Sequence, residues 1–175
     1  MTQLTFTPVQ DPDHIAELAN FAEEIFREYY PRMLTSEKLE YVLVRTLSAG
    51  VLVGQIADDG YEYYFADIDG DHVGYLGIQP REDCLYLGKV YIRAGERGKG
   101  FGRQAFEFVK RRMRELGLHA IRLACNRDNM DALTRYDHMG FSIYGEENVD
   151  IGNGYELNNY LLEWTDDKEK EPSAQ

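Results

Sequence analysis

The segment that most constrains the fold is a glycine-rich turn between a strand-like run and a helix-like run. The apolar residues of Leu85–Ile92 predict a strand, and the amphipathic pattern of Phe101–Leu116 predicts a helix. The turn between them contains Arg97, Gly98, Lys99, Gly100, Phe101, Gly102 and Arg103. Glycines let the backbone pass close to a ligand, and the first amides of a helix point outward with a partial positive charge. The segment therefore predicts an anion-binding turn.

Two common phosphate-binding patterns do not fit this turn. A Walker-type loop needs Ser or Thr after its Gly-Lys pair to hold magnesium, but Lys99 is followed by Gly100. A dinucleotide-binding turn needs Gly-x-Gly-x-x-Gly, whereas Arg103 stands where the third glycine belongs. The acidic residue expected about twenty positions later is also missing, because the next predicted strand ends at Leu123-Ala124-Cys125. The sequence therefore disfavours both a nucleoside triphosphate and a dinucleotide.

Three motifs, in order along the chain, resemble one enzyme family. They are Arg97-x-x-Gly100-x-Gly102, Asn129-x-x-Ala132-x-x-x-Tyr136-x-x-x-Gly140-Phe141, and Asp150-Ile151-Gly152-x-Gly154-Tyr155-Glu156-Leu157-x-x-Tyr160. They resemble the acetyl-CoA pyrophosphate loop, the following helix and the closing strand of the GCN5-related N-acetyltransferase family. The resemblance implies that acetyl-CoA is the donor substrate, that an amine accepts the acetyl group, and that no metal is required.

The resemblance also assigns the donor-binding residues. The turn from Arg97 to Arg103 is expected to bind the pyrophosphate through backbone amides, charge and the dipole of the helix that it opens. The strand residues Val90, Tyr91 and Ile92 are expected to splay from the neighbouring parallel strand. Their backbone groups would then pair with the pantetheine arm and polarise the acetyl carbonyl. The side chains of Val90 and Ile92 are expected to belong to the core.

Two residues of the second motif complete the predicted site. Tyr136 is expected to be the general acid, because a phenol has an ordinary pKa of about 10 and can donate a proton to the departing thiolate. Asn129 lies two helical turns earlier, and the shared face is the one that the resemblance directs at the coenzyme. Asn129 could bind the coenzyme, cap the helix, or do both.

The order of predicted elements is typical of an α/β fold with a mixed central sheet of about seven strands and helices on both faces. The segment from Leu85 to Cys125 reads as strand, turn, helix and strand, and a right-handed crossover makes its two strands parallel. Two predicted helices precede the main sheet, one in Asp13–Tyr29 and one that begins after Thr35 or Ser36. The other predicted strands are Leu4–Val9, Tyr61–Ile68, His72–Gln79, Phe141–Tyr144 and Tyr155–Trp164. We expect one N-acetyltransferase domain over residues 1–164 and a disordered acidic tail over 165–175.

The charge distribution indicates the kind of ligand and partner. The net charge is -12, yet residues 93–114 carry eight basic and two acidic side chains, a local +6, which leaves -18 elsewhere. This distribution disfavours nucleic acid, and it favours an anion at the turn and a cation over the remaining surface. No signal peptide and no apolar run of about 18 residues is present, so we expect a cytoplasmic protein without a membrane partner. The two cysteines, Cys84 and Cys125, are expected to be reduced and buried.

The acceptor and the general base are less well defined by the sequence. A small cationic amine such as a polyamine suits the aromatic and acidic segment where the family builds its acceptor pocket, namely Glu24, Glu28, Tyr29, Tyr30 and Tyr41. Base candidates are Glu156, Asp150, Glu28, Glu82 and a chain of water molecules. Lys89 is unusual in an apolar strand, and we expect its ammonium to extend to the sheet surface.

Other functions stay open at this point. The acceptor could be a protein N-terminus or a lysine side chain, or the chain could be a non-catalytic sensor of coenzyme A on the same fold. A basic-turn domain that binds phosphopeptides would need no coenzyme. The exposed C-terminal strands make a homodimer a further alternative.

Overall fold

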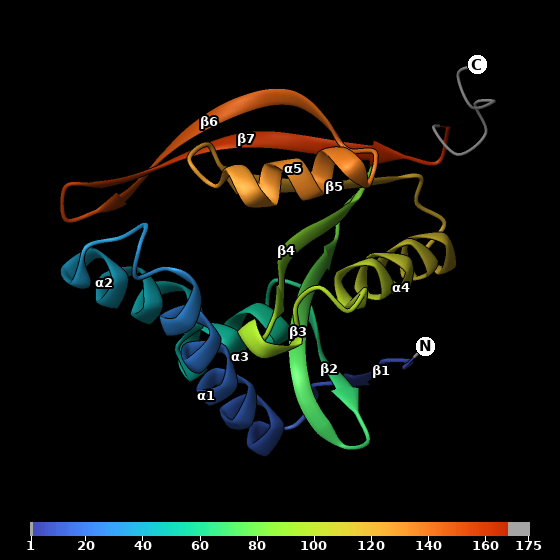
Figure 1. Cartoon of the computed structure of the whole chain (residues 1–175), viewed down its shortest axis with the longest axis horizontal. Helices are drawn as coiled ribbons and strands as arrows, with labels where there is room; N and C mark the ends of the chain where they lie inside the picture. The colour runs from blue at the N-terminus through green and yellow to red at the C-terminus, as the bar shows by residue number, and fades with distance from the viewer. Residues whose placement is uncertain (1, 168–175) are drawn as a thin grey trace. The chain divides into compact units, whose positions relative to one another are not determined.

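Seven strands form one mixed sheet in the computed structural model, which describes residues 2–167. The strands are β1 (Thr5–Pro8), β2 (Glu62–Ile68), β3 (Asp71–Pro80), β4 (Leu85–Ile92), β5 (Ala120–Asn126), β6 (Ser142–Gly152) and β7 (Tyr155–Thr165). The helices are α1 (Pro12–Tyr29), α2 (Ser36–Leu47), α3 (Ala49–Ala57), the 3₁₀ helix η1 (Ala94–Glu96), α4 (Phe101–Glu115) and α5 (Met130–His138). The strand order is β1-β2-β3-β4-β5-β7-β6, which confirms the predicted α/β class (Figure 1).

The chain forms two compact units. The N-terminal unit comprises Met1–Gln79 and Lys89–Phe108, and the C-terminal unit comprises Pro80–Gly88 and Val109–Gln175. The chain therefore passes from one unit to the other three times, at the end of β3, within β4 and within α4. Strand β7 includes Thr165, so it extends one residue into the predicted tail, and residues 168–175 of that tail lie outside the described part of the chain.

In the N-terminal unit, α1 buries its apolar face against an antiparallel sheet. Strand β1 pairs with β2, and β2 pairs with β3. Helix α1 begins at Pro12, because the side chain of Asp11 accepts a hydrogen bond from the amide of His14 and because proline is favourable in the first turn. Its buried residues, at helical spacing, are Ile15, Leu18, Phe21, Ala22, Ile25 and Phe26. Burying each large apolar side chain contributes about 1.5–3 kcal/mol, so this stripe holds α1 in place.

The sequence pattern did not predict the α-helix α3 of the N-terminal unit. Ser48 lies between α2 and α3 in an extended conformation, with ψ 151°, and its side chain caps α3 by accepting from the amide of Val51. Helix α3 was missed because its residues are almost all small or apolar and show little periodicity. Three helices, rather than the predicted two, therefore precede β2.

Within residues 2–167, one helical stretch, Ser36–Ala57, has the length and composition of a membrane span. The extended Ser48 divides this stretch into helices of 12 and 9 residues. A spanning helix needs about 20 residues, so neither helix is long enough alone.

In the C-terminal unit, α5 and a long hairpin of β6 and β7 accompany β5 (Figure 1). The parallel register of β4 and β5 joins Leu85 to Ile121 and Tyr86 to Arg122, which confirms the predicted crossover. Strand β7 pairs antiparallel with both β5 and β6. The hairpin turns at Gly152–Gly154, where all three residues have positive φ (86°, 55° and 77°). Strand β6 is longer than the predicted Phe141–Tyr144, because its polar residues are held by the β7 backbone rather than by burial.

Both cysteines are free and buried, as predicted. Burial raises the pKa of the Cys125 thiol to about 11. A thiol with that pKa is protonated at neutral pH and is a poor nucleophile, so Cys125 serves packing.

Candidate functional site

The predicted anion turn leaves β4 through η1 and enters α4. The amide of Arg93 donates to the carbonyl of Val73 at 2.8 Å, which fixes the end of β4 before the turn begins. Gly98 and Gly100 adopt φ values of 80° and 83°, and a Cβ added at either position would meet no atom within 4 Å. The space around them is therefore open, and the requirement for glycine is conformational. Gly102 is helical and equally uncrowded, so its backbone would tolerate a side chain.

The basic side chains of the turn differ in their surroundings. The Arg97 guanidinium bends back toward the strand: its Nε donates to the Ile92 carbonyl at 3.0 Å, and its Cζ lies 4.9 Å from the centre of the Tyr29 ring. The Lys99 ammonium forms an ion pair with Glu96 at 2.8 Å. Arg103 is exposed in the first turn of α4. An exposed ion pair such as Lys99–Glu96 contributes only about 0–1 kcal/mol, so a phosphate could replace Glu96 as the partner of Lys99.

The donor-strand residues Val90, Tyr91 and Ile92 are half-buried. Ile92 packs against a core cluster that includes Val73 and Phe101, as predicted for its side chain. The Tyr91 hydroxyl forms a 2.7 Å hydrogen bond with the Tyr30 hydroxyl, and the Tyr91 ring lies 5.6 Å from the Tyr75 ring. The predicted splay of these residues away from β5 stays a prediction.

The predicted acceptor segment lies mainly at the C-terminal end of α1, and it contacts the chain that leads into the turn. Glu24 accepts from the Arg93 guanidinium at 3.0 Å, and Glu28 accepts from the Ala94 amide at 3.4 Å. Tyr29 and Tyr30 contact Arg97 and Tyr91, as described above. Four of the five predicted acceptor residues therefore gather beside the same short segment. The Tyr41 ring lies 5.3 Å from the Arg45 guanidinium on its own helix, α2.

In the C-terminal unit, Asn129 and Tyr136 mark the two ends of α5. The Asn129 side chain caps the helix by accepting from the Ala132 amide at 3.2 Å, so its predicted capping role is confirmed. Tyr136 is half-buried, and its ring packs edge-on against Phe141 with 5.4 Å between ring centres. Their roles toward the coenzyme stay predictions.

The base candidates also occupy defined positions. Asp150 and Glu156 lie directly opposite each other across the β6–β7 hairpin, and the Asp150 side chain accepts from the Gly152 amide at 2.8 Å. Glu82 is exposed between β3 and β4. Glu28 contacts the Ala94 amide. None of these contacts singles out one carboxylate as the base. Within residues 2–167, no group of three or more His, Cys, Asp and Glu side chains could hold a metal ion.

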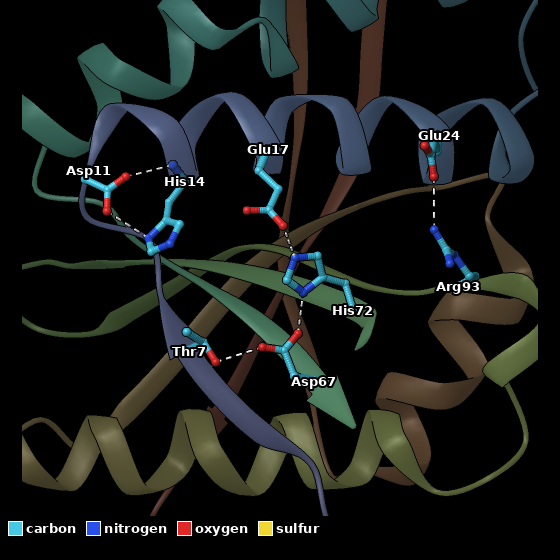
Figure 2. A network of polar contacts seen from close by, with 8 residues as sticks. All are labelled: Thr7, Asp11, His14, Glu17, Glu24, Asp67, His72 and Arg93. Atoms are coloured by element: carbon cyan, nitrogen blue, oxygen red, sulfur yellow. Dashed lines mark hydrogen bonds and ion pairs between the residues drawn. The ribbon is translucent and has the colours of Figure 1, made fainter. Parts of the chain in front are cut away.

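A cavity of about 480 Å³ lies in the N-terminal unit, between α1, the start of β3 and η1. Figure 2 shows the polar contacts around it, centred on His72. The His72 ring contacts Asp67 through Nδ1 at 2.5 Å and Glu17 through Nε2 at 2.6 Å. Thr7 donates to the other oxygen of Asp67 at 2.8 Å. Because the Thr7 hydroxyl donates to the carboxylate and not to the imidazole, this chain of hydrogen bonds does not activate a nucleophile.

Sequence reasoning missed this network, although one signal was present. Asp67 is a buried carboxylate between apolar residues of strand β2, with 8% of its surface exposed. A buried carboxylate needs partners, which points to a nearby histidine, lysine or arginine. His72 supplies that partner from the next strand, and its ring also stacks on Phe65 at 3.8 Å.

Lys89 does not extend to the sheet surface as predicted. Its side chain is half-buried, and its ammonium donates to the Thr46 carbonyl at 2.8 Å and to the Tyr63 hydroxyl at 3.0 Å. Thr46 lies in the last turn of α2, where carbonyl groups lack helical partners. The backbone of α2 therefore holds this cation inside the N-terminal unit.

Comparison with known proteins agrees with the order of these elements. An uncharacterised N-acetyltransferase from Lactobacillus delbrueckii subsp. lactis is 25% identical over 160 residues, which cover 87% of this chain and 92% of the relative. Among solved structures, the PaiA N-acetyltransferase of Thermoplasma acidophilum, in complex with coenzyme A, superposes with a TM-score of 0.74 at 16% identity, covering 93% of this chain and 99% of that one. The spermidine/spermine N-acetyltransferase SpeG of Vibrio cholerae, in complex with manganese ions, gives 0.66 at 17% identity, covering 98% of both chains.

The structural likenesses support the fold, and the family match identifies the chemistry. Residues 16–141, which include the turn, α4 and all of α5, match the Acetyltransferase (GNAT) family. Within this family the enzymes use acetyl-CoA as the acyl donor. The chain therefore belongs to the GNAT family and is an acetyl-CoA-dependent N-acetyltransferase.

Proposed function

We propose that this enzyme transfers the acetyl group of acetyl-CoA to a small cationic amine, by direct attack of the amine in a ternary complex. The observation that carries the donor site is the conformation of the turn, with Gly98 and Gly100 in the left-handed region just before α4 begins. That conformation, together with the helix N-terminus and Lys99, fits a diphosphate group.

In this proposal, each predicted site residue has a defined role in binding acetyl-CoA or in acetyl transfer. The turn and α4 bind the diphosphate, and the backbone of Val90–Ile92 orients the thioester arm and polarises its carbonyl. Tyr136 donates its proton to the departing thiolate as the bond from carbon to sulfur breaks and the bond from carbon to the amine nitrogen forms, and the proton that the amine loses passes to a carboxylate or to water. Asn129 binds the coenzyme from the start of α5. Acetyl-CoA supplies the activated acyl group.

The negative charge of the chain outside residues 93–114 favours a cationic acceptor. Outside residues 93–114 the chain carries -18, and the C-terminal half of α1 presents Glu24 and Glu28 with Tyr29 and Tyr30. Carboxylates and aromatic faces attract ammonium groups. SpeG, a structural neighbour, is a spermidine/spermine N-acetyltransferase. A peptide or protein amine is the second candidate, because the same negative charge would attract a protonated N-terminus or a lysine side chain.

The donor site is tested by comparing two glycine variants. Gly100→Ala forces a residue with a side chain into the left-handed region, which costs about 1–2 kcal/mol and should shift the turn, so acetyl-CoA should bind roughly 5- to 30-fold more weakly. Gly102→Ala is the matched control, because that position is helical and open. Dissociation constants come from titration calorimetry. Equal donor affinity for Gly100→Ala and the unaltered enzyme would rule out the proposed turn.

The acceptor is tested by measuring thiol release with polyamines, amino acids, aminoglycosides and basic peptides. Fastest turnover with polyamines is the expected result. Preference for peptides would favour the second candidate, and donor binding without thiol release from any amine would favour a non-catalytic sensor.

A further inference from the structure

Lys89 ends one chain of hydrogen bonds that links four elements of the N-terminal unit. Its ammonium, on β4, donates to the Thr46 carbonyl of α2 and to the Tyr63 hydroxyl of β2. The Tyr63 hydroxyl in turn donates to Gln55 of α3 at 2.6 Å. A cation at the C-terminal end of α2 is favourable because the helix dipole is negative there. The side chain thus ties β4 to α2, β2 and α3 at one point.

Stability alone does not explain a lysine at this position. Desolvation lowers the pKa of Lys89 to about 8, which means that burying its charge disfavours the folded state. The pKa is lower in the folded than in the unfolded chain, so this penalty is present at neutral pH and disappears as pH rises through about 8 toward the ordinary lysine value. A methionine of similar length would fill the same space without this desolvation penalty. A residue that weakens folding is better explained by function.

The position of Lys89 in the strand indicates what that function is. Lys89 is the first residue of β4 that belongs to the N-terminal unit, and Val90–Ile92 follow it directly. Two residues later, on the same strand face, Tyr91 bonds to Tyr30 of α1. Side chains at alternate positions therefore fasten this end of β4 to three helices and β2.

We infer that Lys89 is a positioning residue for acetyl transfer: it holds the start of the donor strand so that the backbone of Val90–Ile92 keeps the direction required by the thioester. The inference rests on the proposed donor site. The diphosphate turn supplies most of the donor affinity, so loss of Lys89 should slow turnover much more than it weakens donor binding.

The test compares Lys89→Met with Lys38→Met. Lys38 is the matched control, because it is another half-buried lysine of the N-terminal unit, on α2, and lies outside the donor strand and the diphosphate turn. Lys89→Met should lower kcat at least about tenfold, change the donor Kd less than about threefold, and leave Tm at pH 7 unchanged or higher. Lys38→Met should leave kcat and donor Kd unchanged.

Lys89→Arg supplies an independent readout, because it keeps a cation that cannot titrate below about pH 12. With both substrates saturating, the unaltered enzyme should lose turnover above about pH 8 as the ammonium loses its proton, and Lys89→Arg should retain substantial kcat without that step. The groups that face the ammonium are the Tyr63 hydroxyl, whose pKa is raised by burial, and the Thr46 carbonyl. Neither becomes charged in this range.

The outcomes separate this inference from the donor-site proposal. If Gly100→Ala weakens donor binding but Lys89→Met keeps full kcat, Lys89 has no positioning role. If Lys89→Met fails to fold or loses more than about 8 °C in Tm, its role is structural and the inference is overturned. If Gly100→Ala binds acetyl-CoA normally, the donor site itself is misplaced, whatever Lys89 does.

Discussion

Tyr136 occupies the last turn of α5, where its ring packs edge-on against Phe141. This packing involves the ring, whereas the proposed catalytic role involves only the hydroxyl. The two roles can therefore be separated by a change that removes one oxygen atom and keeps the aromatic ring.

For Tyr136→Phe we predict a fall in kcat of roughly 10²-fold or more, because a general acid contributes about 10²–10⁴-fold. The donor Kd and Tm should change little, since ring packing is retained. Steady-state kinetics and calorimetry measure the three quantities. Tyr144→Phe is the control, because Tyr144 is 51% exposed on β6. Full activity in Tyr136→Phe would remove this residue from the mechanism.

Residues whose roles depend on local backbone could be predicted from the sequence. Gly98 and Gly100 have the positive φ that a turn between a strand and a helix requires, and Asn129 caps the helix that follows it. The partners of Lys89, and the contact of His72 with Glu17, could not be predicted, because they come from elements far away in the chain. Only tertiary packing brings Thr46 to Lys89, or Glu17 to His72.

At the scale of elements, His72 connects α1 to the β2–β3 hairpin. Desolvation lowers the pKa of His72, but hydrogen bonds to Asp67 and Glu17 outweigh it and give a net upward shift. The protonated ring donates to both carboxylates at once. It therefore acts as a charged link between a helix and a hairpin that are otherwise joined by apolar contacts such as Phe21–Phe65.

We predict that this link makes stability depend on pH. Because the pKa is raised on folding, its contribution is fully present below the unfolded value of about 6.5 and is lost as pH rises through the higher folded value. Tm measured from pH 5 to pH 8 should therefore show a step that His72→Gln abolishes. His14→Gln is the control, since the His14 ring contacts Asp11, the residue that caps its own helix. An identical step in His72→Gln would assign the dependence to another group.

The elements themselves were predictable where periodicity was strong. Helix α1 and the crossover from β4 to β5 have clear apolar patterns and match their predicted positions closely. Helix α3 and most of β6 do not, because the first is apolar on nearly every side and the second is exposed along most of its length. Prediction from periodicity requires an element with one apolar face and one polar face, and neither α3 nor β6 shows a clear difference between its faces.

At the scale of the whole molecule, the uneven charge should govern encounter with substrates. We predict that residues 93–114 attract the anionic donor and that the acidic remainder of the chain attracts a cationic amine. Salt screens both attractions, with a Debye length that shrinks from about 10 Å at 0.1 M to about 3 Å at 1 M.

We predict that kcat/KM for a polyamine, measured at saturating acetyl-CoA, falls several-fold between about 0.05 and 0.5 M NaCl. A weakly charged amine acceptor should show a smaller change and serves as the control. Equal salt dependence for both acceptors would contradict an electrostatic basis for acceptor choice.

The chain crosses between the units three times, at Gln79–Pro80, Gly88–Lys89 and Phe108–Val109, so each unit is built from two separated stretches of sequence. No single cut in the polypeptide can release either unit whole. A fragment ending at Gln79 would contain Thr46 and Tyr63 but not the lysine that they bind, and it would also lack the glycine turn. Shortened forms of this enzyme should therefore be designed from the termini inward, and never by division at the middle.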